Sequence, residues 1–431
     1  MKFLYLFFTQ WNKDGWKKYS ANAGWLFLAR VVSFTTSFLT VAIVARYLGP
    51  ENLGKLSYAQ SMIAIASVVA SLGINQIVFR ELVKRPEEES LIIGTAIITR
   101  LFAGTIALIL SVLVSLILGN EQLLTLLIGI MGLTFIVNPV STVGLLFGAQ
   151  VKSKYTSYVS ITSAILIPLF KIVLVLRGEG IIFFAGVFVV EALISVIFSL
   201  YIYRTYFSSH GLNWQWQWRE AKALLLQAWP LLFASVSTYI YGKMDQIMLL
   251  HFLDASAVGL YSVVVQLREI AILVPGIFMG SVLPALINVR LHDTLDYYRR
   301  WRYLFVGSIG IVTSLAVLIS LGNAAIIRIL FGEEFLPAVP ILQIFIWTSV
   351  FSIIIQLTRQ LLIIEERTHM YLVSTVIGIT ANLALNYTLI PRFGAEGAAY
   401  ATLITLVIVL LSLLTSSVVR RNIAGMLGRH A

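Results

Sequence analysis

The sequence predicts an all-α polytopic membrane protein with about 12 transmembrane helices in two pseudo-symmetric six-helix lobes. The chain has 431 residues, of which 59% are hydrophobic and 12% are charged, and its mean hydropathy is +0.90. Soluble domains of this length do not have such a composition. Its apolar stretches recur at about 20 residues, which is the length of a helix that crosses a bilayer. A short turn motif of the first half also returns in the second half.

The apolar stretches are interpreted as helices because they are longer and more continuous than the strands of a membrane barrel. Hydropathy locates the spans, and glycine, proline and clusters of charge set their ends. The predicted spans cover residues 24–47, 57–79, 91–118, 122–147, 155–176, 181–203, 223–252, 258–286, 303–322, 338–364, 370–390 and 397–419.

Loop cations predict the orientation of the spans, because cytoplasmic loops are enriched in Lys and Arg. If the N-terminus is inside, the inner side holds Lys13, Lys17, Lys18, Lys84, Arg85, Lys152, Lys154, Arg204, Arg219, Arg290, Arg299, Arg300, Arg302, Arg367, Arg420 and Arg421. The outer side keeps Lys55, Arg177, Arg328 and Arg392. We therefore expect a protein of the cytoplasmic membrane with both termini in the cytoplasm. The net charge of +11 reflects this topology, and no nucleic-acid partner is expected.

Two repeated turns predict that the two lobes arose by duplication. LGPENLGKLS (Leu48–Ser57) and LDASAVGLYS (Leu253–Ser262) share leucine, glycine and serine at equal spacing, and GEG at 178–180 is matched by AEG at 395–397. The long polar connection between the halves reads as a linker. The predicted limits are 1–23 for a cytoplasmic N-terminal segment, 24–205 for the N-lobe, 206–222 for a cytoplasmic linker, 223–419 for the C-lobe and 420–431 for a cytoplasmic tail.

Charged residues inside the spans are the candidate site, because a charge at that depth is costly unless it is paired or faces water. Arg100, Lys243 and Arg268 lie far from the span ends, so we expect them to line a central cavity that attracts an anion such as phosphate. Three further cations are second choices for this cavity: Arg30, Lys171 and Arg359. The competing interpretation is that each cation reaches an interface or forms a structural ion pair.

Acidic residues are scarcer in the spans, and three of them are candidates for ion coupling: Asp245, Glu269 and Glu191. Lys243 and Asp245 are about 200° apart around a helix, so both cannot point at one cavity. Asp245 is then either a partner of a cation on another helix or a titrating group. Glu191 lies at a depth similar to that of Lys171, which favours a structural pair. The chain has no cysteine, and we find no nucleotide-binding or hydrolase motif, so neither cofactor nor metal is expected.

Three motifs at the predicted spans resemble a known family: ARYLGPENLGKLSYAQ (Ala45–Gln60), DQIMLLHFLDASAVGLYSVVVQLRE (Asp245–Glu269) and ALNYTLIPRFGAEGAAYATLIT (Ala384–Thr405). They are similar to the Wzx-type polysaccharide and O-antigen flippases of the multidrug/oligosaccharidyl-lipid/polysaccharide exporter superfamily. The resemblance implies a V-shaped transporter, like the MATE multidrug antiporters, that flips polyprenyl-diphosphate-linked oligosaccharides. It also implies that a proton or sodium gradient drives transport and that cavity cations receive the diphosphate.

We therefore expect a secondary-active flippase of polysaccharide biosynthesis, which takes a lipid-linked glycan and contacts membrane lipids. Polymerase and chain-length proteins of the same pathway are expected as further partners. Two alternatives stay open. A cation-coupled multidrug antiporter would share the fold and carry a net negative cavity. A membrane polymerase or ligase of the pathway would be an enzyme, and such enzymes typically have a large outer loop.

Overall fold

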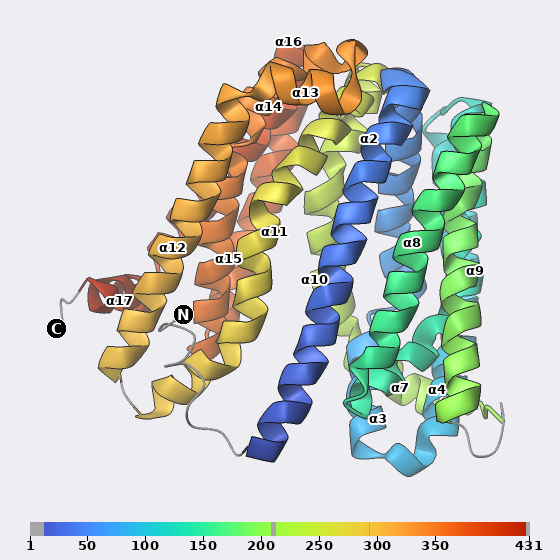
Figure 1. Cartoon of the computed structure of the whole chain (residues 1–431), viewed down its shortest axis with the longest axis vertical. Coiled ribbons are helices and arrows are strands. Elements are labelled where there is room, and N and C mark those ends of the chain that lie inside the picture. The colour runs from blue at the N-terminus through green and yellow to red at the C-terminus, as the bar shows by residue number, and fades with distance from the viewer. Residues whose placement is uncertain (1–12, 208–212, 293, 428–431) are drawn as a thin grey trace. The chain divides into compact units, whose positions relative to one another are not determined.

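The computed structural model describes residues 13–207, 213–292 and 294–427 (Figure 1). Within these ranges the chain folds into helices, and no strand occurs in them. The predicted N-terminal segment (1–23) and tail (420–431) extend partly beyond the described residues. In a bilayer every backbone polar group must find a partner inside the protein, and helices satisfy this requirement within each span.

Two helices are long enough to cross a membrane twice, and each is bent at a glycine. α2 (Lys13–Ser71) kinks at Gly49, which has a φ of 71° and precedes Pro50. α16 (Thr368–Leu414) kinks at Gly394, which has a φ of 60°. Glycine adopts this left-handed backbone without strain because it has no Cβ. The predicted loops between the first two spans and between the last two spans are therefore sharp kinks.

Shorter helices make up the rest of both halves. The first half continues with α3 (Asn75–Lys84), η1 (Pro86–Glu88), α4 (Glu89–Ile117), α5 (Gln122–Gly132), α6 (Thr134–Val137), η2 (Asn138–Val143), α7 (Gly144–Ala149), α8 (Ser153–Arg177) and α9 (Ile181–Tyr206). The second half contains α10 (Trp218–Phe252), α11 (Ala255–His292), α12 (Thr294–Leu321), α13 (Asn323–Phe331), η3 (Glu333–Ala338), α14 (Val339–Phe345), α15 (Thr348–Ile364) and α17 (Ser417–Met426).

These elements account for twelve spans. Eight helical segments of the described chain are long and apolar enough to cross a membrane, and a ninth is the pair Glu333–Phe345 and Thr348–Ile364, bent by 44°. Two of the eight are the doubly spanning segments bent at Gly49 and Gly394, and α10, which holds the predicted span 223–252, is a helix of 35 residues. The protein is therefore an all-α, multi-pass membrane protein with six spans in each half, as predicted.

The chain divides into two compact units. Among the described residues, one unit, here called the N-unit, comprises 13–48 and 55–243, and the other, the C-unit, comprises 49–54 and 244–427. The border between these two units lies inside α10, and the linker at 206–222 stays a prediction. The first half of α10 belongs to the N-unit because Leu224 and Ala228 are part of its hydrophobic core. Arg85 also binds Glu220 at 2.6 Å, and this hydrogen bond raises the pKa of Arg85.

Internal duplication is visible in the backbone. Val151, between the fourth and fifth spans, and Glu366, between the tenth and eleventh, have φ values of 55° and 57°. The amides of the residues that follow them, Lys152 and Arg367, each donate to a carbonyl five residues earlier at 2.8 Å. Non-glycine residues rarely adopt a positive φ, so its recurrence at corresponding turns supports two repeats of one six-helix design.

The end of the last span differs from the prediction of 397–419. α16 ends at Leu414, and α17 (Ser417–Met426) is a separate amphipathic helix that starts inside the predicted span. Ser416 caps α17, because its hydroxyl accepts a hydrogen bond from the Val419 amide at 3.4 Å. Arg420 and Arg421 would be costly inside the bilayer, which explains why the span ends before them.

Candidate functional site

A pocket of about 350 Å³ lies within the N-unit. It is lined by Gln60, Ile63, Ala64, Ser67, Ala70, Ser71, Arg100, Met131, Thr134, Phe135, Asn138, Pro139, Phe188 and Lys243. Two predicted cavity cations, Arg100 and Lys243, therefore share one pocket. Among the described residues that line it, none is acidic. An electropositive pocket with neutral hydrogen-bonding groups around it is suited to an anion.

Arg100 is oriented by the broken fourth span. Its Nη1 donates to the hydroxyl of Thr142 at 2.6 Å, and this hydroxyl donates to the carbonyl of Pro139 at 2.6 Å. The guanidinium carries five N–H donors, and its buried Nε has no protein partner. Arg100 is therefore held in place by one bond and keeps donors for an anion in the pocket.

Proline and glycine explain how the fourth span reaches Arg100. Pro139 lacks an amide hydrogen, and residues Asn138–Val143 form a 3₁₀ helix between two α-helical pieces. Gly104 lets α4 approach this region, because a Cβ built there would lie 3.0 Å from the carbonyl carbon of Phe135. The irregular backbone borders the pocket through Asn138 and Pro139. Non-helical backbone at membrane depth is tolerated where it lines such a cavity.

Lys243 and Asp245 have different surroundings, as their angular separation on α10 requires. Lys243 faces the pocket of the N-unit, whereas Asp245 is buried in the C-unit with 7% of its surface exposed. The sequence left open whether Asp245 pairs with a cation. In the structure its hydrogen-bond partners are the neutral side chains of Tyr261, Asn386 and Thr402.

Asp245 is the centre of a polar cluster formed by three helices of the C-unit, α10, α11 and α16. Tyr261 of α11 donates to its Oδ2 at 2.7 Å, and Thr402 of α16 donates to the same oxygen at 2.9 Å. Asn386, also of α16, donates its Nδ2 to Oδ1 at 2.6 Å and to Asn382 Oδ1 at 3.1 Å. We call Asp245, Tyr261, Asn382, Asn386 and Thr402 the Asp245 cluster.

Several buried polar atoms of this cluster lack a protein partner. They are Asn386 Oδ1 and Asn382 Nδ2, together with the hydroxyl of the neighbouring Thr405. Buried polar groups are normally satisfied, so these atoms leave hydrogen-bonding capacity for a further species. Carboxylate, amide and hydroxyl oxygens are also the ligands that hard cations prefer. Among the described residues, no group of three or more His, Cys, Asp and Glu could hold a metal ion.

Arg268 and Glu269 lie in the C-unit on α11. Arg268 Nη1 binds Glu269 Oε1 at 3.2 Å, its Nη2 donates to the hydroxyl of Ser352, and its guanidinium lies 5.5 Å from the ring centroid of Phe345. Its buried Nε has no protein partner. Arg268 is therefore tethered to α15 and α14, while the carboxylate of Glu269 is half exposed.

The remaining predicted site residues are dispersed. Arg30 is exposed on α2, and Arg359 is exposed on α15 with its guanidinium 5.1 Å from the ring centroid of Tyr371. The Lys171 ammonium lies 5.6 Å from the centroid of Phe188. In the part of the chain that the structure describes, no ion pair joins Lys171 to Glu191, which is exposed on α9. The structural pair of Lys171 and Glu191 stays a prediction.

Sequence reasoning missed the neutral members of both sites. Asn138 and Thr142 were not singled out beside Arg100, nor were Asn386 and Thr402 beside Asp245. A signal was available in span 11, where the two asparagines of ANLALN are four residues apart and so share one helix face. Polar residues at such depth are costly without partners, and they deserve the same weight as charges.

Comparison with known proteins decides the family. The family model described as polysaccharide biosynthesis protein matches residues 20–289, which is more than half of the chain. The chain belongs to this family. The chain is also 29% identical over 174 residues to the probable flippase AglR of Haloferax volcanii. That alignment covers 38% of this chain and 36% of the relative, so the chain aligns with little more than a third of it.

Solved structures of flippases and multidrug transporters share the fold of this family member. The lipid II flippase MurJ in its inward closed conformation matches with a TM-score of 0.74 at 14% identity, over 95% of this chain and 90% of MurJ. An inward-facing MATE family transporter of the MOP superfamily matches with a TM-score of 0.69 at 12% identity, over 94% of this chain and all of that chain. These structures confirm the predicted fold class.

Proposed function

We propose that the protein is a secondary-active flippase that moves a polyprenyl-diphosphate-linked oligosaccharide across the cytoplasmic membrane. Transport proceeds by alternating access, and both termini lie in the cytoplasm. Membership of the polysaccharide biosynthesis family and the flippase-type fold support this proposal. The asymmetric distribution of loop cations supports the orientation.

The observation that carries the proposal is the N-unit pocket with two cations and no acid among its described lining residues. Arg100 offers a guanidinium fork to phosphate oxygens, and Lys243 adds a point charge. Asn138, Gln60 and Ser67 would bind sugar hydroxyls or the remaining phosphate oxygens. Arg268 is the corresponding candidate cation of the C-unit. The substrate of this site is therefore an anion, which disfavours a cationic-drug antiporter.

The Asp245 cluster is the proposed coupling site. Its carboxylate is held by three neutral donors, and the cluster keeps buried polar atoms without partners. A sodium ion would find carboxylate, amide and hydroxyl oxygens there, and a proton would neutralise a charge that is costly to bury. Glu269 and Glu191, which are exposed, are the alternative coupling residues.

A leaflet assay tests the transport proposal. In cells depleted of the protein, lipid-linked glycan should accumulate where a membrane-impermeant label does not reach it, and the wild-type chain should restore labelling. The double variant R100Q/K243Q should fail to restore it. The matched control R177Q/R392Q, which removes two exposed cations that do not line the pocket, should succeed. Normal labelling with altered polymer length would instead support a polymerase or ligase.

Ion-dependent thermal stability tests the coupling proposal. A ligand of the folded state at about 100 times its Kd stabilises by about 2.7 kcal/mol, so sodium binding should raise the melting temperature in NaCl relative to choline chloride. D245N should abolish this response, and E269Q should keep it. If the melting temperature of the wild type depends on pH and not on sodium, and D245N loses that pH dependence, the coupling ion is a proton. A response that survives in D245N would refute the assignment of Asp245.

A further inference from the structure

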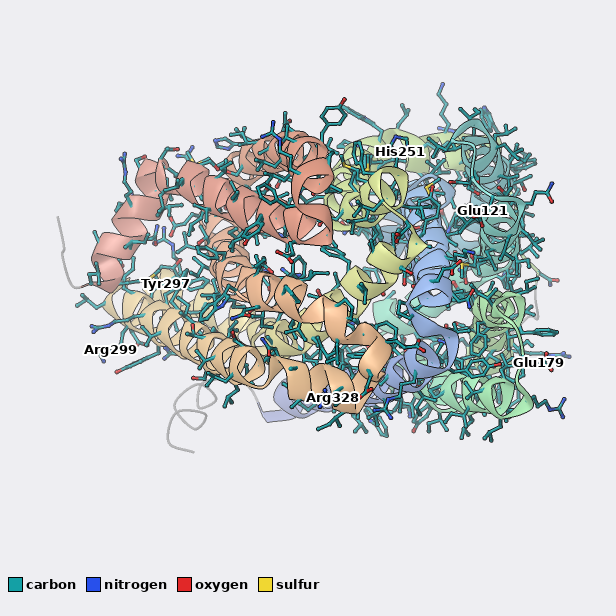
Figure 2. All side chains as sticks on the ribbon, turned by 90° about the horizontal axis from the view of Figure 1, so that it is seen from above. Glu121, Glu179, His251, Tyr297, Arg299 and Arg328 are labelled. Carbon is teal, nitrogen blue, oxygen red and sulfur yellow. The ribbon has the colours of Figure 1, made fainter. Side chains whose placement is uncertain are left out.

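The inner end of the C-unit carries exposed arginines on three elements. Arg299 and Arg302 lie in the first turns of α12, Arg367 lies in the turn before α16, and Arg420 lies on α17. These elements meet at one end of the unit, since α12 starts there and α15 and α16 finish there. In Figure 2, Arg299 lies at the periphery of the unit and points away from its helices. We call these four arginines the basic rim.

The neighbouring acids leave the basic rim with a positive surplus. Asp296 is engaged by Arg300 at 2.7 Å, and the side chain of Glu365 is 4% exposed and bound by Arg290 at 2.7 Å. Glu366 is the exposed acid of the turn. Four exposed cations thus face solvent beside one exposed acid, and a surface of this kind attracts anions.

Exposed apolar side chains accompany the basic rim. Leu295 and Tyr303 on α12 are 61% and 56% exposed, and Leu427, directly after α17, is 62% exposed. α17 itself buries Val419, Asn422 and Met426 and turns Arg420 outward. Gly425 permits close packing on α12, because a Cβ built there would lie 2.7 Å from the Tyr298 ring. A packed amphipathic helix with cations and apolar groups outward is typical of the headgroup layer of a membrane.

We propose that the basic rim binds the headgroups of anionic phospholipids in the inner leaflet. The arginines contact lipid phosphates, while Leu295, Tyr303 and Leu427 enter the boundary between headgroups and acyl chains. Each cation near a membrane surface increases the affinity for anionic lipid about fivefold. This interaction is independent of the transported glycan and anchors the end of the C-unit at a fixed depth.

Lipid selectivity of the full-length protein tests the proposal. Native mass spectrometry of protein in detergent with equal phosphatidylglycerol and phosphatidylcholine should show preferential binding of phosphatidylglycerol. The variant R299Q/R302Q/R420Q should lose this preference by about a hundredfold, given about fivefold per cation. The variant R299K/R302K/R420K, which keeps the charge, should retain it.

Matched controls exclude a simple effect of net charge. The opposite-side variant R177Q/R328Q/R392Q removes three exposed cations that the sequence predicts on the outer side, and it should keep the preference. If the triple glutamine variant of the rim does not fold, R420Q alone should show a loss of about fivefold. The proposal is overturned if the rim variants keep full preference or the opposite-side variant loses it equally. Displacement of phosphatidylglycerol by an equal concentration of a short-chain prenyl diphosphate would also overturn it, because the rim would then be a substrate site.

Discussion

Gly54 and Gly259 bring two corresponding turns of the repeat into backbone contact. A Cβ built on Gly54 would lie 2.8 Å from the Gly259 nitrogen, and one built on Gly259 would lie 3.1 Å from the Gly54 nitrogen. These are the glycines that the sequence repeat pairs. Any side chain at either position meets backbone that cannot rotate away, so glycine is required by packing.

The variant Gly259→Val should therefore be less stable by about 1–3 kcal/mol, which is typical of overpacking. Thermal unfolding in detergent would measure the loss. Gly310→Ala on α12 is the control, because a Cβ there meets nothing within 4 Å, and it should leave the melting temperature unchanged or slightly raised. Equal melting temperatures of Gly259→Val and the wild type would contradict the close backbone contact between Gly54 and Gly259.

Asn386 should be coupled energetically to Asp245. Its Nδ2 donates to Asp245 Oδ1 at 2.6 Å, and Asn386→Leu would leave a buried carboxylate oxygen without that donor. We expect unfolding free energy to fall by about 1–3 kcal/mol. In a double-mutant cycle, Asp245→Leu should lower the unfolding free energy less in the Asn386→Leu background than in the wild-type protein. Additive losses would mean that the bond does not stabilise the cluster.

Thr142 should act on substrate binding through Arg100. Thr142→Val removes the hydroxyl that accepts from Arg100 Nη1 at 2.6 Å while preserving the shape of the side chain. Because hydrogen bonds of charged groups contribute about 1.5–3 kcal/mol, the half-saturating substrate concentration in a flipping assay should rise about tenfold or more. Thr142→Ser keeps the hydroxyl and should behave as wild type. If Thr142→Val melts at the wild-type temperature and its half-saturating substrate concentration is unchanged, Arg100 does not need the hydrogen bond to Thr142 for substrate binding.

The sequence predicted the fold far better than the sites. The length and recurrence of the apolar stretches predict twelve spans, and the matching turns around Gly54 and Gly259 predict the duplication. Both features are read from short stretches of the chain and need no knowledge of which helices pack together. The pocket depends on which face of each helix meets which neighbour. Hydropathy placed Arg100, Lys243 and Arg268 far from the span ends, but it could not tell that Arg268 belongs to another unit and binds Ser352. It also could not show that the partners of Asp245 are neutral, since they lie on other helices, and two of them, Asn386 and Thr402, are more than a hundred positions away.

Arg290 should stabilise the C-unit by neutralising Glu365. The two side chains meet at 2.7 Å, and the side chain of Glu365 is 4% exposed. Arg290→Gln would leave this buried carboxylate with Arg421 at 3.6 Å and the Tyr297 hydroxyl at 3.3 Å. Breaking a buried pair is costly, and because Arg421 and Tyr297 remain we expect a loss of about 2 kcal/mol in thermal unfolding. Adding Glu365→Gln should recover much of the loss, because no buried charge then lacks its partner.

The control Arg328→Gln breaks an exposed pair with Glu333 at 3.7 Å and should cost less than about 0.5 kcal/mol. Equal effects of Arg290→Gln and Arg328→Gln would show that burial does not strengthen the Arg290 pair.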